Sequence, residues 1–131
     1  MLDKIKDSER DYGIAFTIED RSPDRVVARM PVTDRMLNPA GLVNAGAMIW
    51  LADVTATILA LELTNQAAGL SVFPVAVNIQ AALLANQKDG EVVAESRVVR
   101  HGRRLTVVRT AVRGDAAGLL AEVTSTHIPA A

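Results

Sequence analysis

The feature that most constrains the fold of this chain is a continuous apolar segment at residues 45–63, AGAMIWLADVTATILALEL. It is about as long as the ~20 residues that cross a bilayer as a helix. Asp53 in its middle and Glu62 near its end are costly in lipid, and the flanks carry no excess of basic residues. The segment therefore predicts a helix that is apolar on nearly all sides and is buried by other elements of the same protein.

Local signals predict where this helix begins and ends. Pro39 and Gly41 interrupt helix before it, and Asn44 is a suitable N-cap because its side-chain oxygen accepts hydrogen bonds from first-turn N–H groups. Asn65 and Gly69 mark its end.

The residues on both sides of the helix follow the two-residue period of strands. Residues 13–20 place Ile14, Phe16 and Ile18 on one face, and residues 25–32 form a hairpin partner after a Ser-Pro-Asp turn. Residues 70–84 predict a strand in which Pro74 indicates a sheet edge or a bulge. Three more strands are expected at residues 91–100, 103–113 and 119–128, with turns at Asp89-Gly90, at His101-Gly102 and between Gly114 and Gly118.

The length and composition describe one globular domain, residues 1–131. Hydrophobic residues make up 50% of the chain and charged residues 22%, which suits a packed core. The net charge of -1 gives no general attraction to nucleic acid or to an anionic membrane, and 3% aromatic residues offer no stacking platform for bases. The absence of cysteine removes thiolate catalysis, and two distant histidines make a poor metal site. The charged start, MLDKIKDSER, predicts a cytoplasmic location.

A helix that is apolar all round must be covered on more than one side, which an antiparallel sheet curved around it achieves. We therefore expect an α+β fold, the hot-dog fold, with five to six strands wrapped around one long central helix. Residues 37–57, LNPAGLVNAGAMIWLADVTAT, resemble the hot-dog acyl-CoA thioesterases of the phenylacetate-pathway and 4-hydroxybenzoyl-CoA type, and residues 90–113 resemble that family's strands. The resemblance implies hydrolysis of a coenzyme A thioester to a free acid and coenzyme A.

Asp53 is the first candidate for catalysis. An ionised carboxylate in an apolar helix is costly unless it is paired, hydrated or used, so either an arginine partner or a function is expected. Thr57 lies one turn later, and Trp50 and Gly46 lie on the same helix face. A threonine at such a position ordinarily bonds back to its own helix. In the thioesterase interpretation Asp53 acts as a general base on water or as the nucleophile, and Thr57 supports it.

The start of the helix is the second candidate. First-turn N–H groups lack helical partners and lie at the positive end of the helix dipole, so those of Ala45 and Gly46 either stabilise an oxyanion or mark a tight packing contact. The resemblance implies that the Ala45 amide polarises the thioester carbonyl and that Asn38 orients the water or the thioester. Asn44 and Ala45 stand where the family carries His and Gly. Without the resemblance, Asn38 is an ordinary turn residue before Pro39.

A basic cluster near the last strands is the third candidate. Strand alternation spreads its members over two faces, which is typical of solvated surface. The functional alternative is a grip on the phosphates of coenzyme A, to which arginine is well suited. Arg103 and Arg104, beside the turn at Gly102, and Arg100 are the preferred residues for it. The full cluster is Arg97, Arg100, His101, Arg103, Arg104, Arg109 and Arg113.

Helix geometry predicts that the protein assembles. Ala45 and Asp53 are eight positions apart (53 minus 45), which is roughly 12 Å along a helix at ~1.5 Å per residue, so one carbonyl cannot touch both. A two-fold dimer with antiparallel central helices would supply the amide from one subunit and the carboxylate from the other. The resemblance implies such dimers, paired further into dimers of dimers.

The expected small-molecule partner is an acyl-CoA substrate, with no metal, no bound cofactor, no nucleic acid and no membrane. The acyl group, aromatic or aliphatic, is left open by the sequence. A non-catalytic acyl-CoA or fatty-acyl binding module on the same fold is the alternative.

Overall fold

The apolar segment forms one long helix, and the segments around it form a single antiparallel sheet. The computed structural model describes residues 14–68 and 73–130. Its elements are β1 (Thr17–Arg21), β2 (Arg25–Pro31), the short 3-10 helix η1 (Asp34–Met36), α2 (Ala45–Ala68), β3 (Phe73–Leu83), β4 (Glu91–His101), β5 (Thr106–Gly114) and β6 (Gly118–Ala130).

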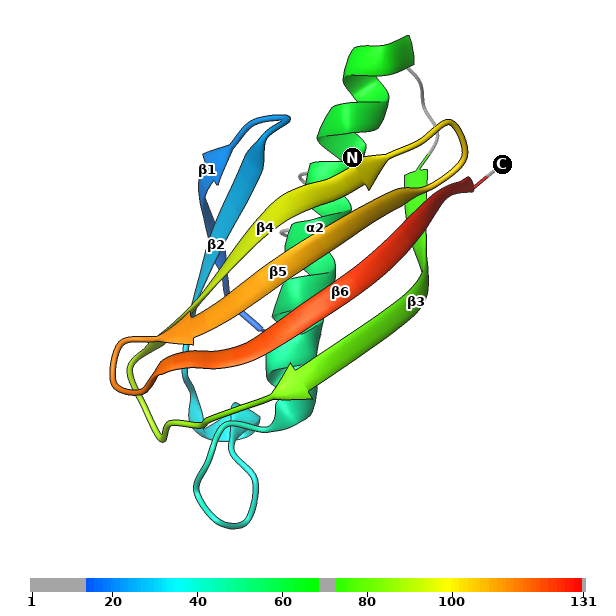
Figure 1. Cartoon of the computed structure of the whole chain (residues 1–131). Coiled ribbons are helices and arrows are strands. Elements are labelled where there is room, and N and C mark those ends of the chain that lie inside the picture. The colour runs from blue at the N-terminus through cyan, green and yellow to red at the C-terminus, as the bar shows by residue number, and fades with distance from the viewer. Residues whose placement is uncertain (1–13, 69–72, 131) are drawn as a thin grey trace.

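The six strands follow the order β1-β2-β4-β5-β6-β3, and each neighbouring pair is antiparallel. α2 lies across one face of the curved sheet, and its first turn lies near the end of β3 (Figure 1). This is the α+β hot-dog arrangement expected from the sequence, with six strands around one central helix.

The predicted strands form with shifted boundaries. β1 begins at Thr17, so Ile14 and Phe16 pack on the core from the segment before the strand. β5 begins at Thr106, which leaves Arg103 and Arg104 in the β4–β5 turn. Of the strand expected at residues 70–84, residues 70–72 lie outside the described part of the chain.

α2 is covered by the sheet along one side. Leu51, Ile58 and Leu59 are fully buried, and the helix contacts strands β2 to β6. It ends at Ala68, directly before Gly69, which with Asn65 was predicted to mark its end. Among the described residues it is also the one helix long and apolar enough to cross a membrane. Its packing against five strands identifies it as the core helix of the domain.

The two edges of the sheet differ in chemistry. β1 is short and carries acidic and basic side chains, which protect an edge from pairing with another strand. β3 has eleven residues and no charged side chain, and Val77 is 55% and Leu83 51% exposed. Leu83 is paired with buried Ala121, and directly opposed residues share a face of the sheet, so Leu83 is exposed on the side that faces α2. β3 is therefore a long, open, apolar edge.

Gln87 links the β3–β4 connection to its surroundings. This buried side chain donates through Nε2 to the carbonyl oxygens of Asp89 at 2.8 Å and Glu91 at 2.9 Å, and to Asp115 Oδ1 at 3.2 Å. The Gln87 backbone oxygen also accepts from the Val43 N–H at 3.0 Å. This one residue therefore ties the chain just before α2 to two turns of the sheet.

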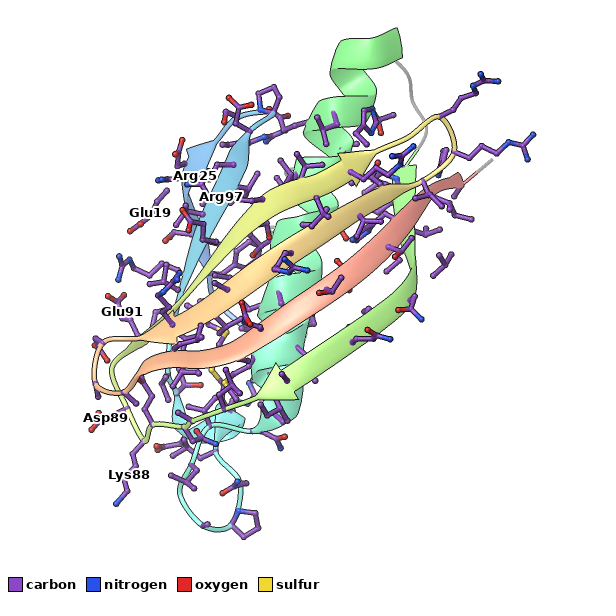
Figure 2. All side chains as sticks on the ribbon, in the orientation of Figure 1. Glu19, Arg25, Lys88, Asp89, Glu91 and Arg97 are labelled. Carbon is purple, nitrogen blue, oxygen red and sulfur yellow. The ribbon has the colours of Figure 1, made fainter. Side chains whose placement is uncertain are left out.

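We expect Gln87→Met to destabilise the fold by about 2–3 kcal/mol, because it keeps the side-chain length but removes three part-buried hydrogen bonds that the Gln87 amide donates. Urea unfolding measures the change. Lys88→Met is the matched control, since Lys88 extends into solvent beside Gln87 (Figure 2). A loss at Gln87 no larger than at Lys88 would contradict this role.

Candidate active site at the helix start

The first turn of α2 is capped by Asn44. Asn44 Oδ1 accepts a hydrogen bond from the Gly46 N–H at 3.2 Å, and the Asn44 carbonyl accepts from the Ala47 N–H at 3.0 Å. The N-cap prediction is confirmed. Within the described residues the Ala45 N–H has no hydrogen-bond partner, so of the two predicted oxyanion donors only Ala45 is free in this conformation.

The position of Ala45 is set from the sheet. The Val43 N–H donates to the Gln87 carbonyl, and Asn86 Nδ2 donates to the Val43 carbonyl at 3.0 Å. The Asn44 N–H donates to the Met36 carbonyl at 2.7 Å. Both residues before Ala45 are thus held by hydrogen bonds from outside the helix. Sequence reasoning missed Asn86 and Gln87, because nothing local shows that this connection meets the helix start.

Asn38 closes the loop that precedes the helix. Its Oδ1 accepts from the Ala40 N–H at 2.9 Å and the Leu42 N–H at 3.1 Å. The side-chain oxygen is therefore committed to the turn, as the ordinary interpretation of an Asn before Pro39 expects. The side-chain NH₂ group has no partner within the described residues and is therefore the part of Asn38 that remains uncommitted.

Asp53 lies half-buried on the part of α2 that the sheet leaves open. Burial raises its pKa above the ordinary value of 3.8, and interaction with the Thr57 hydroxyl partly lowers it again. Its Oδ1 is buried without a hydrogen-bond partner among the described residues, and no arginine pairs with it there. The described residues therefore do not support the first alternative, in which an arginine neutralises the Asp53 carboxylate. Thr57 is buried and faces Asp53, as the helix spacing predicts.

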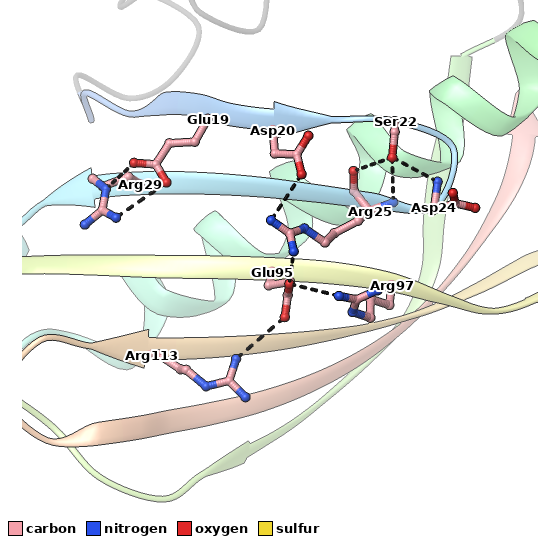
Figure 3. Close-up of polar contacts among 9 residues, drawn as sticks. All are labelled: Glu19, Asp20, Ser22, Asp24, Arg25, Arg29, Glu95, Arg97 and Arg113. Atoms are coloured by element: carbon pink, nitrogen blue, oxygen red, sulfur yellow. Dashed lines mark hydrogen bonds and ion pairs between the residues drawn. The ribbon is translucent and has the colours of Figure 1, made fainter.

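The basic cluster separates into paired and unpaired arginines. On the outer face of the sheet, Glu95 pairs with Arg25 and Arg97 at 3.3 Å and with Arg113 at 3.9 Å (Figure 3). Arg100, Arg103 and Arg104 are exposed at the end of β4 and in the β4–β5 turn, without ion pairs among the described residues. That turn lies at the opposite end of the sheet from the start of α2 (Figure 1).

A cavity of about 440 Å³ lies beside the start of α2, and we name it the helix-start cavity. Sequence analysis missed it, because its walls come from three separate segments. Asp53 does not line it, although Trp50, one turn earlier, does. The lining residues are Ile14, Thr33, Arg35, Met36, Asn44, Gly46, Ala47 and Trp50.

No three His, Cys, Asp or Glu side chains gather into a metal-binding group within residues 14–68 and 73–130. The polar groups around the helix start are a backbone amide, carboxamides, a hydroxyl and the Arg35 guanidinium. Such groups bind a carbonyl oxygen or orient water by hydrogen bonding.

Comparison with known proteins assigns the family. The model of the thioesterase superfamily matches residues 40–121, and the chain belongs to this superfamily. The match includes the helix start, all of α2 and strands β3 to β5. A comparison with curated proteins finds no matching sequence.

Solved structures share the fold. A mutant thioesterase from Staphylococcus aureus subsp. aureus Mu50 superposes with a TM-score of 0.82 at 23% identity, over 88% of this chain and 93% of the other. A hypothetical thioesterase from Streptococcus pneumoniae TIGR4, solved with coenzyme A, gives 0.82 at 19% identity over 96% of both chains. A mutant thioesterase from Pseudomonas aeruginosa gives 0.80 at 25% identity, over 98% of this chain and 91% of the other.

We compare the free energy of unfolding of Asp53→Asn with that of the parent. We expect this difference to favour the variant more at about pH 7.5 than at about pH 4. Because the folded-state pKa of Asp53 is raised, the folded protein keeps a proton that the unfolded chain releases as pH rises above 3.8. The free energy of unfolding of the parent therefore falls through this window, and the Asn variant lacks that fall. Urea unfolding of both proteins at each pH measures the difference.

The exposed turn residue Asp24 supplies the control, because Asp24→Asn removes a carboxylate that no ion pair holds (Figure 3). An equal difference between Asp53→Asn and the parent at both pH values would contradict the raised pKa.

Proposed function

We propose that this protein is an acyl-CoA thioesterase that uses Asp53 as its carboxylate. The observation that carries the proposal is a half-buried carboxylate with an unpartnered oxygen, placed on the open side of the central helix in a member of the thioesterase superfamily. A carboxylate kept unpaired at the cost of burial is typical of a functional group. The coenzyme A bound to the Streptococcus pneumoniae protein supports coenzyme A as the thiol part of the substrate.

The proposed reaction begins with the thioester oxygen at the Ala45 N–H. Asp53 either removes a proton from water as the water oxygen attacks the carbonyl carbon, or attacks that carbon itself to form an anhydride that water then hydrolyses. In both cases the carbonyl electron pair moves onto oxygen, where Ala45 stabilises it, and then expels the thiolate as the carbon–sulfur bond breaks. The products are the free acid and coenzyme A, and the scheme needs no metal and no bound cofactor.

Helix geometry requires a second subunit in this scheme. Ala45 and Asp53 are both on α2, at positions that differ by eight residues, or roughly 12 Å along the axis. The open apolar edge of β3 supports a dimer in which β3 of each subunit pairs with β3 of the other, continuing both sheets. We propose that each site takes the Ala45 amide from one subunit and Asp53 from its partner, and that dimers pair further into tetramers.

The same two-fold pairing supports the prediction that arginines bind the phosphates of coenzyme A. The β4–β5 turn lies at the Phe73 end of β3, whereas the helix start lies near the Leu83 end (Figure 1). An antiparallel pairing of two β3 strands brings the Phe73 end of the partner to the Leu83 end of this chain. We propose that Arg103 and Arg104, with Arg100 beside them, bind the coenzyme A phosphates of the partner's site. The cytoplasmic location remains a prediction from the sequence.

A non-catalytic acyl-CoA binding module is the second candidate. The hydrogen bond from Gly46 to Asn44 favours it, because this contact leaves only one of the two first-turn amides free to stabilise an oxyanion. Release of free thiol from a panel of acyl-CoAs separates the two functions. Turnover supports the enzyme, and binding without turnover supports the module.

We expect Asp53→Asn to lower the rate of thioester hydrolysis by roughly 10²- to 10⁴-fold with the fold retained, because it removes the charge at nearly constant shape. Steady-state assays of thiol release measure this effect. Glu62→Gln is the control on the same helix, since Glu62, unlike Asp53, has an arginine partner, Arg21, at 2.8 Å. Activity of the Asp53 variant within a few-fold of the parent would make Asp53 structural.

Mixing two inactive variants tests the shared site. Asp53→Ala removes the carboxylate, and Asn38→Asp keeps the acceptor for the Ala40 and Leu42 amides while removing the NH₂ donor. Because Asn38 belongs with the Ala45 end of the site, each mixed dimer would hold one intact site. Random exchange makes about half of the dimers mixed, so roughly a quarter of parental activity should return. Verified exchange without recovery would contradict the two-subunit site.

A further inference from the structure

The helix-start cavity has the size and the wall chemistry of a small-molecule site. Its volume of about 440 Å³ falls within the range of roughly 300–1,000 Å³ typical of ligand pockets. Ile14, Met36, Ala47 and Trp50 supply apolar walls. Thr33, Arg35 and Asn44 add polar groups that can fix the orientation of a bound ligand.

The cavity adjoins the free amide. Asn44 and Gly46 both line it, and they are the two neighbours of Ala45 in the chain. The hydrogen bond from the Asn44 N–H to the Met36 carbonyl holds η1 against the helix start. A carbonyl group at the Ala45 N–H therefore has this cavity beside it, and the group attached to the carbonyl carbon can extend into it.

The apolar walls are held in place by the core. Met36 and Ala47 are buried, and the Trp50 ring packs edge-to-face on Phe16 with a centroid distance of 5.5 Å and an interplanar angle of 80°. These contacts hold the wall formed by Met36, Ala47 and Trp50 in place. This apolar wall is therefore preformed in the subunit.

Arg35, which is itself exposed to solvent, gives this cavity a positive charge. Within residues 14–68 and 73–130 it makes no ion pair, in contrast to Arg21, Arg25 and Arg29, each of which pairs with a carboxylate. Thr33 also lines the cavity, and its hydroxyl makes no capping hydrogen bond to η1. A guanidinium with an adjacent hydroxyl suits a carboxylate, because several N–H and O–H donors can converge on two oxygens.

Arg35 and the free amide lie at the same cavity. Arg35 directly precedes Met36, whose carbonyl is bonded to Asn44 at the helix start. An acyl group whose carbonyl lies at Ala45 can therefore extend toward the guanidinium within this cavity. An uncharged chain end there would place apolar atoms against a charged group, which removes solvent from the charge without replacing it.

We propose that the helix-start cavity binds the acyl group of the substrate and that Arg35 selects an acyl chain that ends in a carboxylate, as in the monothioester of a dicarboxylic acid. This inference rests on the proposed thioesterase function. It adds to that function a substrate class and a specificity-determining residue. A phosphate of coenzyme A is the other anion that Arg35 could bind, and the experiment separates the two sources.

The test compares two thioesters of nearly equal shape in the full-length protein. Glutaryl-CoA ends in a carboxylate, and 5-methylhexanoyl-CoA carries methyl groups in place of the two carboxylate oxygens. We expect the parent to favour glutaryl-CoA in kcat/KM. Arg35→Gln should lower kcat/KM for glutaryl-CoA by about tenfold, the size of one partly exposed charge-assisted hydrogen bond, and leave the neutral ester within about twofold.

Two controls make each outcome decisive. Arg113→Gln removes an exposed arginine on the outer face of the sheet and should change neither substrate. The N-acetylcysteamine thioesters of the same two acids lack phosphates, so the Arg35 effect should persist with them. If it disappears with these esters, or if Arg35→Gln lowers both coenzyme A esters equally, Arg35 binds phosphate and the proposal is wrong.

Failure of the proposed function gives a different result. If the parent hydrolyses no member of the acyl-CoA panel, the thioesterase proposal fails and this inference fails with it. If the parent hydrolyses the neutral ester and the ratio of the two substrates does not depend on Arg35, the thioesterase proposal stands and only the acyl-group assignment is overturned.

Discussion

The burial of α2 is the constraint on which the rest of this structure depends. A helix with apolar side chains in nearly every direction is stable in water only when several strands curve around it, and α2 contacts β2 to β6. A sheet covers one side of a cylinder, however, and cannot enclose it. The residues left on the open side include Trp50 and Asp53, which are only partly buried. The incomplete cover therefore determines where chemistry is accessible.

The open side of the helix and the open edge of the sheet have a common cause. β3 is the last strand of the order β1-β2-β4-β5-β6-β3, and its helix-facing residues Ile79 and Leu83 are 40% and 51% exposed because no strand among the described residues pairs with its outer edge. Charged side chains protect β1, the other edge, whereas β3 carries none. A second copy on β3 would extend the sheet and shield the same apolar surface. Pairing through β3 would therefore bury this apolar surface and also form the two-subunit site.

Most of the fold follows from period and composition. Alternation along residues 91–100 and 119–128 predicts two of the strands, and a uniformly apolar helix predicts the curved sheet around it. Asp53 is also recognisable from the sequence alone, because it is a charged residue inside an apolar segment. Gln87 and Arg35 were not predictable in this way. Their roles depend on contacts with Val43, Glu91 and the helix-start cavity, which join segments far apart in the chain.

The start of α2 shows how such long-range contacts determine chemistry. The Asn44 cap stabilises the helix by about 1 kcal/mol. Its side chain accepts a hydrogen bond from the Gly46 N–H, which was one of the two predicted oxyanion donors. One donor, Ala45, remains, so its direction matters more than it would in a pair. That direction is fixed by Gln87 and Asn86 through Val43 and by Met36 through Asn44. An amide held from both the sheet and η1 loses little freedom when charge develops beside it, which is the condition for electrostatic stabilisation by a preorganised group.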